Sequence, residues 1–384
     1  MKGLLRFFKR KVTQGVNILP LSSKIIGTPR KCSTSAAYLK QHSEIDVYQL
    51  VKEEDLSLHL PVLNRESFLS LFLFKRKTKD VAVFCLKNAR VWGEYGAVVT
   101  SDDVFLSDIS REFRVINPCE DHAIFHNIML NRSIPVSGKT AVIATAGPDT
   151  FYHWMLDILP RILFLKEAGI FEKIDKFVLN NSSLPYHRQT LALLGIDERQ
   201  ILGCFKNRDF HIEAEELYVP SLPSNLNEVN AYECRLLKKY LLPEVGQLAT
   251  HKRIYITRRI TNTRTILEEE KLMSYLQNYG FIMVEPEVLS FEEQMEIFNS
   301  ADIIIGPHGS AFTNIIFCRP GTVLLELIPD TYLITCFYNI AAQLGVKYYG
   351  FIGKGIPIDE NKKIDNIWVD LQEFSHFFEK NILK

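Results

Sequence analysis

Short apolar runs typical of buried strands alternate with stretches of helical periodicity between residues 253 and 326. Strands are predicted at 253–257, 281–284, 302–305 and 322–326, and helices at 268–279, 290–301 and 311–317. This alternation favours a parallel sheet, because each crossover between parallel strands needs a covering segment. We therefore expect a doubly wound nucleotide-binding fold over roughly 100 residues.

A weaker alternation of the same kind precedes it. Strands are predicted at 140–145, 176–180 and 216–220, with helices at 152–168 and 187–194. Before them, an antiparallel set is expected at 81–85, 89–92, 96–100 and 104–106, with a hairpin turn at Asp102-Asp103. Residues 44–75 are expected to be helical or irregular. The predicted fold class is α/β, with two Rossmann-like lobes facing a cleft and a small β-rich preface in the N-terminal lobe.

The length of 384 residues exceeds the roughly 250–300 residues at which single cores stop growing, so more than one domain is expected. The predicted division has a basic N-terminal segment, an N-terminal lobe, a C-terminal nucleotide-binding lobe and a C-terminal helical extension. Their ranges are 1–43, 44–245, 246–350 and 351–384.

Charge and cysteine usage narrow the function classes. Lys+Arg 45 balances Asp+Glu 45, which argues against a nucleic-acid partner. The basic residues that precede Glu44 favour peripheral contact of residues 1–31 with an anionic membrane surface, or else a solvated terminus. No stretch approaches the ~20 apolar residues of a membrane span, and the expected location is the cytoplasm or the inner face of its membrane. The seven cysteines form no Cys-x-x-Cys pair, which favours free thiols over a disulfide framework or a zinc site.

The strongest local signal is the segment 303–314, in which a buried strand, a Gly-Pro-His-Gly loop and a helix follow one another. The free amide groups of a helix N-terminus favour an anion such as a diphosphate, and His308 could donate to a phosphate oxygen. The alternative is an ordinary strand-to-helix turn. The ligand that carries this diphosphate is called the donor. The residues expected to bind it are Arg258, Arg259, Gly306, Pro307, His308, Gly309, Ser310, Thr313, Asn314 and Glu326.

Arg258 and Arg259 follow a strand of the same predicted sheet, and guanidinium groups bind diphosphate without a metal. They could equally be a pair of surface arginines. Glu326 ends a buried strand, where an acid often accepts from ribose hydroxyls, or it caps the following turn. The sequence contains no Asp-x-Asp pair, so no metal and no cofactor beyond the donor substrate is expected.

His153 and Asp157 lie four residues apart at the start of a predicted helix, and so on one face of it. Such a carboxylate can orient the imidazole, or act itself as general base toward an acceptor hydroxyl. Tyr152 and Trp154 could stack on a sugar ring; the alternative is a helix start with buried aromatic side chains. The sequence contains no Gly-x-x-x-x-Gly-Lys-Ser/Thr phosphate loop and no Gly-x-Ser-x-Gly elbow, which disfavours kinases, ATPases and hydrolases.

Several motifs taken together resemble glycosyltransferase family 61. They are FYHWMLDILPR at 151–161, YITRR at 255–259, Gly280-Phe281, Val284-x-Pro-Glu287, LSFEEQ at 289–294, IIGPHGSAFTN at 304–314 and Leu325-Glu326. The resemblance implies a GT-B fold and an inverting, metal-independent transfer from a nucleotide sugar, commonly a UDP-sugar. It assigns Arg258, His308 and Gly309 to the donor site, and His153 and Asp157 to the catalytic face on the acceptor side. Ser310 stands where many relatives have alanine.

The resemblance also implies a surface-glycan acceptor. Eukaryotic members act in the secretory pathway, and this sequence shows no signal anchor, so we expect an enzyme of capsular polysaccharide or lipopolysaccharide biosynthesis with a glycan or lipid-linked glycan acceptor. One alternative is another transferase on the same scaffold, moving a phosphoryl, pyruvyl or alditol-phosphate group. The other is a non-catalytic glycan-assembly subunit.

Overall fold

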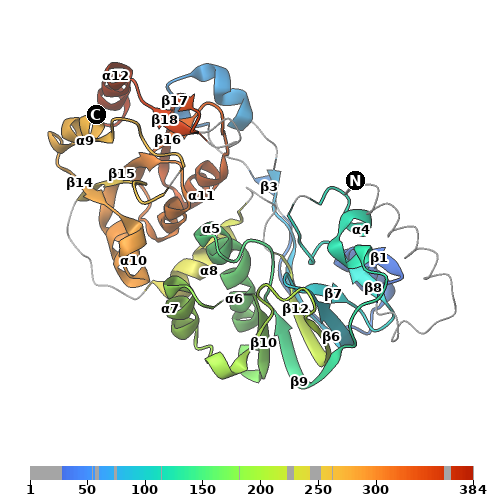
Figure 1. The fold of residues 1–384 in the computed structure, drawn as a ribbon. Helices are drawn as coiled ribbons and strands as arrows, with labels where there is room; N and C mark the ends of the chain where they lie inside the picture. Colours follow the sequence, from blue (N-terminus) through green and yellow to red (C-terminus); the bar gives the residue numbers. More distant parts are fainter. Residues whose placement is uncertain are drawn as a thin grey trace. The chain divides into compact units, whose positions relative to one another are not determined.

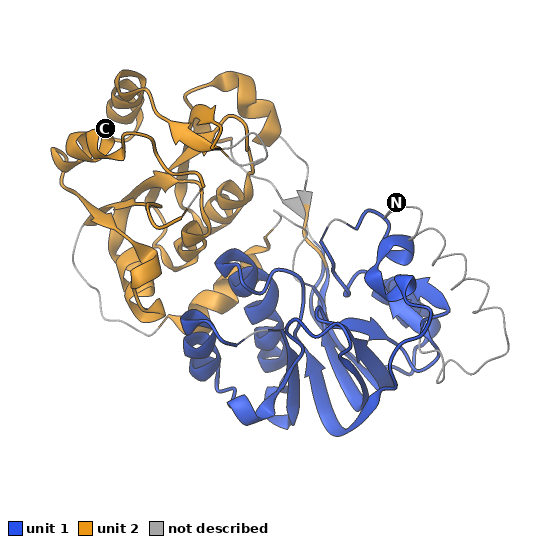
Figure 2. Cartoon of the chain, in the orientation of Figure 1, with its two compact units in different colours: residues 1–53, 80–223 blue, residues 54–79, 224–384 orange. Residues whose placement is uncertain are grey.

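The computed structural model describes residues 28–53, 55–56, 60–72, 76–113, 115–180, 182–222, 229–242, 252–261, 263–358 and 365–383. It is mixed α/β and divides into two compact units (Figure 2). Unit 1 comprises Met1–Glu53 and Asp80–Pro223, and unit 2 comprises Glu54–Lys79 and Ser224–Lys384. Most of the predicted membrane-contacting segment 1–31 lies outside the described residues.

The division differs from the contiguous lobes expected from the sequence, with their boundary at residue 245. Residues 54–79 belong to unit 2 because β4 (Val62–Leu63) pairs in parallel with β17 (Lys347–Ile356). The side chain of Asn64 reinforces this pairing, since its Oδ1 accepts from the Ile352 amide at 2.7 Å. A strand of two residues that pairs nearly 300 positions away leaves no local pattern in the sequence.

Unit 1 is built on one nine-stranded sheet of order β1-β8-β7-β6-β12-β9-β10-β11, with β2 also paired to β6 (Figure 1). The strands are β1 (Lys31–Ser33), β2 (Val47–Val51), β6 (Val81–Trp92), β7 (Ala97–Val99), β8 (Val104–Leu106), β9 (Ile134–Val142), β10 (Lys176–Leu179), β11 (Ile201–Gly203) and β12 (His211–Pro220). β12, β9, β10 and β11 run parallel, whereas β6 is antiparallel to β12 and β7. The sheet is therefore mixed.

The predicted antiparallel preface exists, with β7 and β8 forming the expected hairpin, but it continues the main sheet instead of standing apart. The sequence predicts two strands where the structure has the single strand β6. No break occurs between residues 85 and 89, because the strand passes through Asn88 with φ of 52°, a conformation that asparagine tolerates. The prediction for residues 44–75 was wrong at β2, which is a strand.

The helices of unit 1 cover its sheet, and α6 packs on β6 and β12. They are α3 (Ser35–Gln41), α4 (Pro118–Asp121), η2 (Ala123–His126), α5 (Phe151–His153), the π-helical turn η3 (Trp154–Ile158), α6 (Leu159–Glu167), η4 (Phe171–Lys173), α7 (Pro185–Leu194) and η5 (Glu198–Gln200). A disulfide joins Cys32 in β1 to Cys119 in α4. The expectation of free thiols therefore holds for the five other cysteines but is wrong for this pair, which the fold brings together across 87 positions.

Unit 2 contains the predicted doubly wound sheet, of order β14-β13-β15-β16-β17-β18. Its strands are β13 (Lys252–Ile256), β14 (Phe281–Val284), β15 (Ala301–Pro307), β16 (Val323–Pro329), β17 and the antiparallel β18 (Asn366–Trp368). Numbered in chain order, the parallel strands β13 to β17 run 2-1-3-4-5 across the sheet, so the direction of winding reverses between β13 and β15. A short ribbon of β3 (Asp55–Leu56) and β5 (Arg76–Lys77) stands apart.

The helices of unit 2 are η1 (Glu66–Phe72), α8 (Ala231–Leu241), α9 (Glu269–Gln277), η6 (Pro286–Val288), α10 (Phe291–Ser300), η7 (Ser310–Phe317), α11 (Cys336–Leu344) and α12 (Leu371–Asn381). Ser290 caps α10 with Glu293 in the predicted capping box. The helix predicted after the His308 loop is a 3₁₀ helix, η7. The sequence predicts a helical extension over 351–384. The first residues of this range instead belong to β17, and β18 precedes the helix α12.

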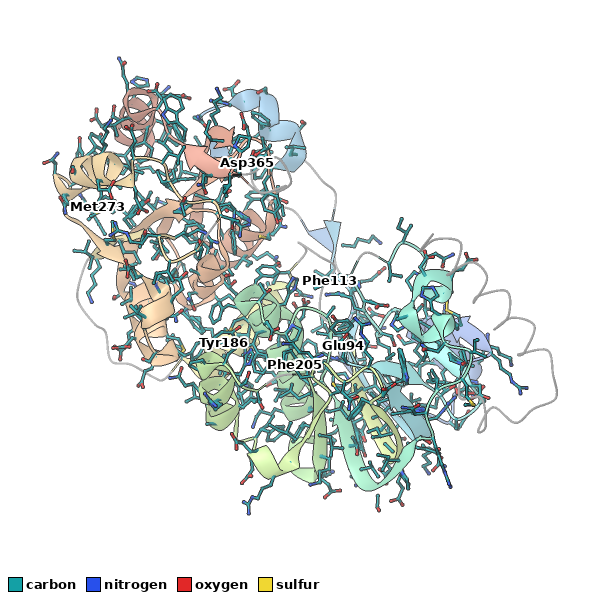
Figure 3. All side chains as sticks on the ribbon, viewed as in Figure 1. Glu94, Phe113, Tyr186, Phe205, Met273 and Asp365 are labelled. Carbon is teal, nitrogen blue, oxygen red and sulfur yellow. A yellow bond between two sulfur atoms is a disulfide. The ribbon has the colours of Figure 1, made fainter. Side chains whose placement is uncertain are left out.

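The core of unit 2 is apolar and largely aromatic. Met273 of α9, labelled in Figure 3, packs in one cluster with Phe281, Phe374 and Phe378. At roughly 1.5–3 kcal/mol for each fully buried large apolar side chain, such a cluster fixes the sheet that carries the loops described next. In the part of the chain that the structure describes, no helix has the length and hydropathy to cross a membrane.

Candidate functional site

The carboxyl ends of β13 and β15 meet at the point where the winding of unit 2 reverses, the usual ligand edge of a doubly wound sheet. β13 leads into Arg258 and β15 into His308, so the topology brings together two of the predicted donor-binding residues. Gly306 allows this approach: a Cβ there would lie 2.6 Å from the Ile256 carbonyl oxygen. Its role is thus to let the two strands pack closely.

The guanidinium of Arg258 lies against Gly309. A Cβ on Gly309 would stand 2.1 Å from Arg258 Nη1, so only glycine leaves room for the cation. Arg258 is 8% exposed, and its Nε donates to the Thr263 carbonyl at 3.3 Å. In the described residues it forms no ion pair. Burial and the nearby charge of Arg264 lower the pKa of Arg258 to about 10, with Glu287 opposing the shift, so the group stays charged at neutral pH.

A buried cation without a carboxylate partner is unusual, because desolvation costs several kcal/mol unless an anion compensates it. The first amide groups of η7 lie beside this cation, since Gly309 is the N-cap of η7. No side chain caps these amides. A guanidinium without an ion pair among the described residues, next to the first amides of η7, is suited to an anionic ligand.

His308 is held by a buried carboxylate. Its Nδ1 is hydrogen-bonded to Glu326 Oε1, and the Tyr348 hydroxyl donates to Glu326 Oε2 at 2.6 Å. Glu326 is fully buried. The burial of Tyr348 and the negative charge of Glu326 raise the pKa of Tyr348 well above its usual value. Because both oxygens of Glu326 are occupied, its place is behind His308 rather than at a ribose. Nε2 of His308 has no hydrogen-bond partner among the described residues.

Arg264, which the sequence did not single out as a site residue, adds a second cation. It has φ of 56°, a strained value for arginine, and its guanidinium lies 5.3 Å from the ring of Tyr332. That ring packs edge-on against His308. The Arg264 amide donates to the carbonyl of Asp365, a residue labelled in Figure 3. The strained backbone at Arg264 is a feature that the sequence alone does not show.

The remaining predicted donor residues separate into three groups. Arg259 turns to Glu269 (3.4 Å) and Glu285 (3.7 Å), so the two neighbouring arginines do not act together. Thr313 and Asn314 are fully buried in η7, where Asn314 Nδ2 donates to Gln294 at 2.9 Å. Pro307 ends β15, and Ser310 opens η7 beside Gly309.

The second constellation lies in unit 1, where α5 meets the π-helical turn η3. The Nδ1–H of His153 donates to Asp157 Oδ2 at 2.7 Å, since an ionised carboxylate only accepts. Asp157 Oδ1 accepts from Arg111 Nη1 at 2.9 Å. The predicted pair is therefore a triad whose third member, Arg111, the sequence did not indicate. π-helical turns are frequently found at functional sites, and Asp157 lies within this one.

Trp154, expected as a candidate for sugar stacking, is instead a core residue. It is fully buried, its indole N–H donates to Thr190 at 2.9 Å, and its ring packs on His187. Burial lowers the pKa of His187 to about 4, so this histidine is neutral and structural. Tyr152 is partly exposed and remains compatible with a ligand contact.

No group of three or more His, Cys, Asp or Glu side chains that could hold a metal ion occurs within the described ranges. The two constellations consist instead of histidines, carboxylates and arginines. That chemistry can move a proton and bind an anion.

Comparison with known proteins places both constellations in one family segment. Residues 151–325 match the family model described as Glycosyltransferase 61. A xylan glycosyltransferase of Arabidopsis thaliana is 30% identical over 100 residues, covering 24% of this chain and 20% of the relative. The EGF domain-specific O-linked N-acetylglucosamine transferases of Drosophila melanogaster and Gallus gallus are 27% and 26% identical over 166 and 161 residues. These cover 40% and 38% of this chain.

The chain thus spans about a fifth to a third of the length of these curated relatives, which is 20%, 32% and 30% in turn. The matched segment includes His153, Asp157, Arg258 and His308, and it ends one residue before Glu326. The resemblance to glycosyltransferase family 61 that the motifs predict is therefore confirmed, over residues 151–325 of the chain.

Proposed function

We propose that this chain is a glycosyltransferase that moves a sugar from a nucleotide sugar to an acceptor hydroxyl. The observation that carries the proposal is the buried, unpaired guanidinium of Arg258, packed on Gly309 at the switch point of the unit 2 sheet. A diphosphate leaving group would supply the missing negative charge, and His308 Nε2 and the η7 amides add donors. The names of the relatives, a xylan glycosyltransferase and O-linked N-acetylglucosamine transferases, support the same class of reaction.

The finer features follow from the family resemblance and belong to the proposal. The donor is a UDP-sugar, the transfer inverts the anomeric centre, and cations of the protein replace a metal. His153 and Asp157 serve the acceptor. The acceptor is a glycan, either a surface polysaccharide or a lipid-linked precursor.

The cytoplasmic location expected from the sequence also stays a prediction. The Cys32–Cys119 disulfide argues for an oxidising compartment instead, because such bonds are rare where thiols are kept reduced. Mass analysis of alkylated protein from its native cells would decide: a free Cys32 thiol supports the cytoplasm, and a disulfide excludes it.

Two substitutions test the donor site directly. Arg258→Ala and His308→Ala are each expected to lower donor-dependent turnover at least about ten-fold, since each removes a charge-assisted contact to phosphate. Arg319→Ala is the matched control, because Arg319 forms an exposed ion pair with Asp302 in the same unit. Wild-type turnover in the first two variants would refute the assignment, as would a strict Mn²⁺ or Mg²⁺ requirement revealed by EDTA.

Nucleotide binding can be measured before any acceptor is known. A ligand that binds only the native state raises stability by about 2.7 kcal/mol at a hundred times its Kd. UDP and UDP-sugars should therefore raise the melting temperature of the wild type and of Arg319→Ala, but much less that of Arg258→Ala. Stabilisation by a UDP-sugar without any release of UDP would indicate a non-catalytic subunit. Mass analysis of the product would expose transfer of a group other than a sugar.

A further inference from the structure

We propose, on the basis of the proposed function, that His153 Nε2 is the group that takes the proton of the acceptor hydroxyl. Asp157 and Arg111 then act through it as positioning residues. Sequence reasoning leaves open whether His153 or Asp157 is the base, and it gives Arg111 no role. The geometry of unit 1 separates the three.

Both oxygens of Asp157 already accept a hydrogen bond from a charged or polar side chain. Oδ1 accepts from Arg111 Nη1 at 2.9 Å, and Oδ2 accepts from His153 Nδ1 at 2.7 Å. The Asp157 side chain is only 4% exposed. Each of these charge-assisted hydrogen bonds is worth about 1.5–3 kcal/mol. The nearly buried carboxylate therefore offers a hydroxyl little accessible surface.

The charge of Asp157 is already balanced without His153. Arg111 is ion-paired to it, and the fully buried Arg161 also acts on it electrostatically. Arg161 is anchored by donating to the carbonyls of Ile143 (2.9 Å) and Ala144 (2.8 Å). Burial and Arg111 lower the pKa of Arg161 to about 9, with Asp157 opposing, so it remains a cation near pH 7. Two cations of unit 1 thus act on this one carboxylate.

The ring of His153 is fixed in place from two further sides. Gly147 approaches so closely that a Cβ there would lie 2.7 Å from His153 Cδ2, and the ring of Phe113 packs against it at 5.1 Å (Phe113 is labelled in Figure 3). Tyr152 meets the same ring edge-on. Nε2 forms no hydrogen bond among the described residues. A ring held by Asp157 at Nδ1, with Nε2 left free, is the arrangement of a general base.

The step balances in atoms and charge. The acceptor O–H bond breaks and its proton passes to Nε2, while the acceptor oxygen forms a bond to the anomeric carbon. The bond from that carbon to the diphosphate oxygen breaks, and its electron pair leaves with the diphosphate. His153 ends as an imidazolium that Asp157 stabilises, and it returns the proton to solvent.

The pH profile of kcat/KM distinguishes an Arg111 that positions the base from an Arg111 that only stabilises the fold. The described groups that act on the His153–Asp157 pair are Arg111, Arg161 and Tyr152. In Arg111→Met one cation is lost, so the protonated ring is favoured and the acid limb should move up by about one pH unit. Arg111→Lys keeps the charge and should move it much less. Arg199→Met is the matched control, since it removes an exposed ion pair with Asp197 in the same unit and should leave the profile unchanged.

A second measurement works even if no donor or acceptor is found. Titration of the full-length protein by NMR, with the His153 ring signals assigned through His153→Gln, should give a higher midpoint in Arg111→Met than in the wild type. An unchanged midpoint and an unshifted acid limb overturn the inference. A shifted midpoint in a protein without any transfer activity supports the charge arrangement while refuting the proposed function.

Chemical rescue then identifies the base. Added imidazole should restore part of the turnover of His153→Ala, because it replaces the missing proton acceptor. If instead formate restores Asp157→Ala while imidazole leaves His153→Ala inactive, Asp157 is the base and the inference is wrong.

Discussion

Each unit of this chain carries one histidine whose Nδ1 faces a buried carboxylate, and the two pairs differ in the third residue. In unit 1, Asp157 between His153 and Arg111 shares its charge with a cation. In unit 2, Glu326 between His308 and Tyr348 receives only a neutral hydroxyl on its other oxygen. A histidine paired with a carboxylate thus occurs in two different charge environments, one with an added cation and one with a neutral hydroxyl.

This difference accounts for opposite roles of the two rings. In unit 1 an arginine pairs with the carboxylate, and we propose that the histidine accepts a proton. In unit 2 the carboxylate accepts from a neutral hydroxyl, and we propose that the histidine donates to a phosphate oxygen. Under this proposal, one motif serves as a base in one unit and as an anion ligand in the other.

The largest expected effect is that of Asp157→Asn. An amide in place of the carboxylate can present its NH₂ to Nδ1 and favour the wrong tautomer of His153, which should lower kcat about a thousand-fold. Donor affinity should stay near that of the wild type, because Arg258 and His308 are untouched. Steady-state kinetics with varied donor would measure both. A large rise in donor KM would show that Asp157 does more than orient the base.

Glu326→Gln should act on the other side of the comparison, with a smaller effect. Loss of the negative charge weakens the hydrogen bond that orients the His308 ring, so the contact of this ring with phosphate weakens by about 1.5–3 kcal/mol. The donor KM should therefore rise about ten-fold to a hundred-fold. Turnover at saturating donor should fall much less. If kcat fell as far as in Asp157→Asn while KM stayed constant, the two pairs would not have distinct roles.

Much of the fold follows from local patterns. The doubly wound sheet of unit 2, the capping box of α10 and the hairpin of β7 and β8 are all predicted from periodicity and turn residues. What sequence reasoning missed depends on contacts between distant positions. β4 joins β17, and Cys32 meets Cys119, because tertiary packing brings together segments that carry only weak local signals.

Prediction of the site residues from the sequence has the same limit. His153 and Asp157 are predictable because they are four residues apart on one helix, and His308 because it follows a buried strand. Arg111 reaches Asp157 from 46 positions away, and Arg264 is marked only by its positive φ. The pair Arg258-Arg259 could not be resolved either, since two adjacent residues after a strand can turn in opposite directions.

The smallest expected effect is that of Arg259. It sharpens the comparison of the two histidine sites, because the proposal assigns the charge at the donor site to Arg258 and not to its neighbour. Arg259 is 45% exposed and paired with Glu269 and Glu285, and an exposed ion pair is worth about 0–1 kcal/mol. Arg259→Ala should therefore change donor affinity by about two-fold or less, against at least ten-fold for Arg258→Ala. Melting-temperature shifts with UDP compare the two variants directly. If both lost the nucleotide equally, the diphosphate would engage both arginines, and the charge of the donor site would not rest on Arg258 and His308 alone.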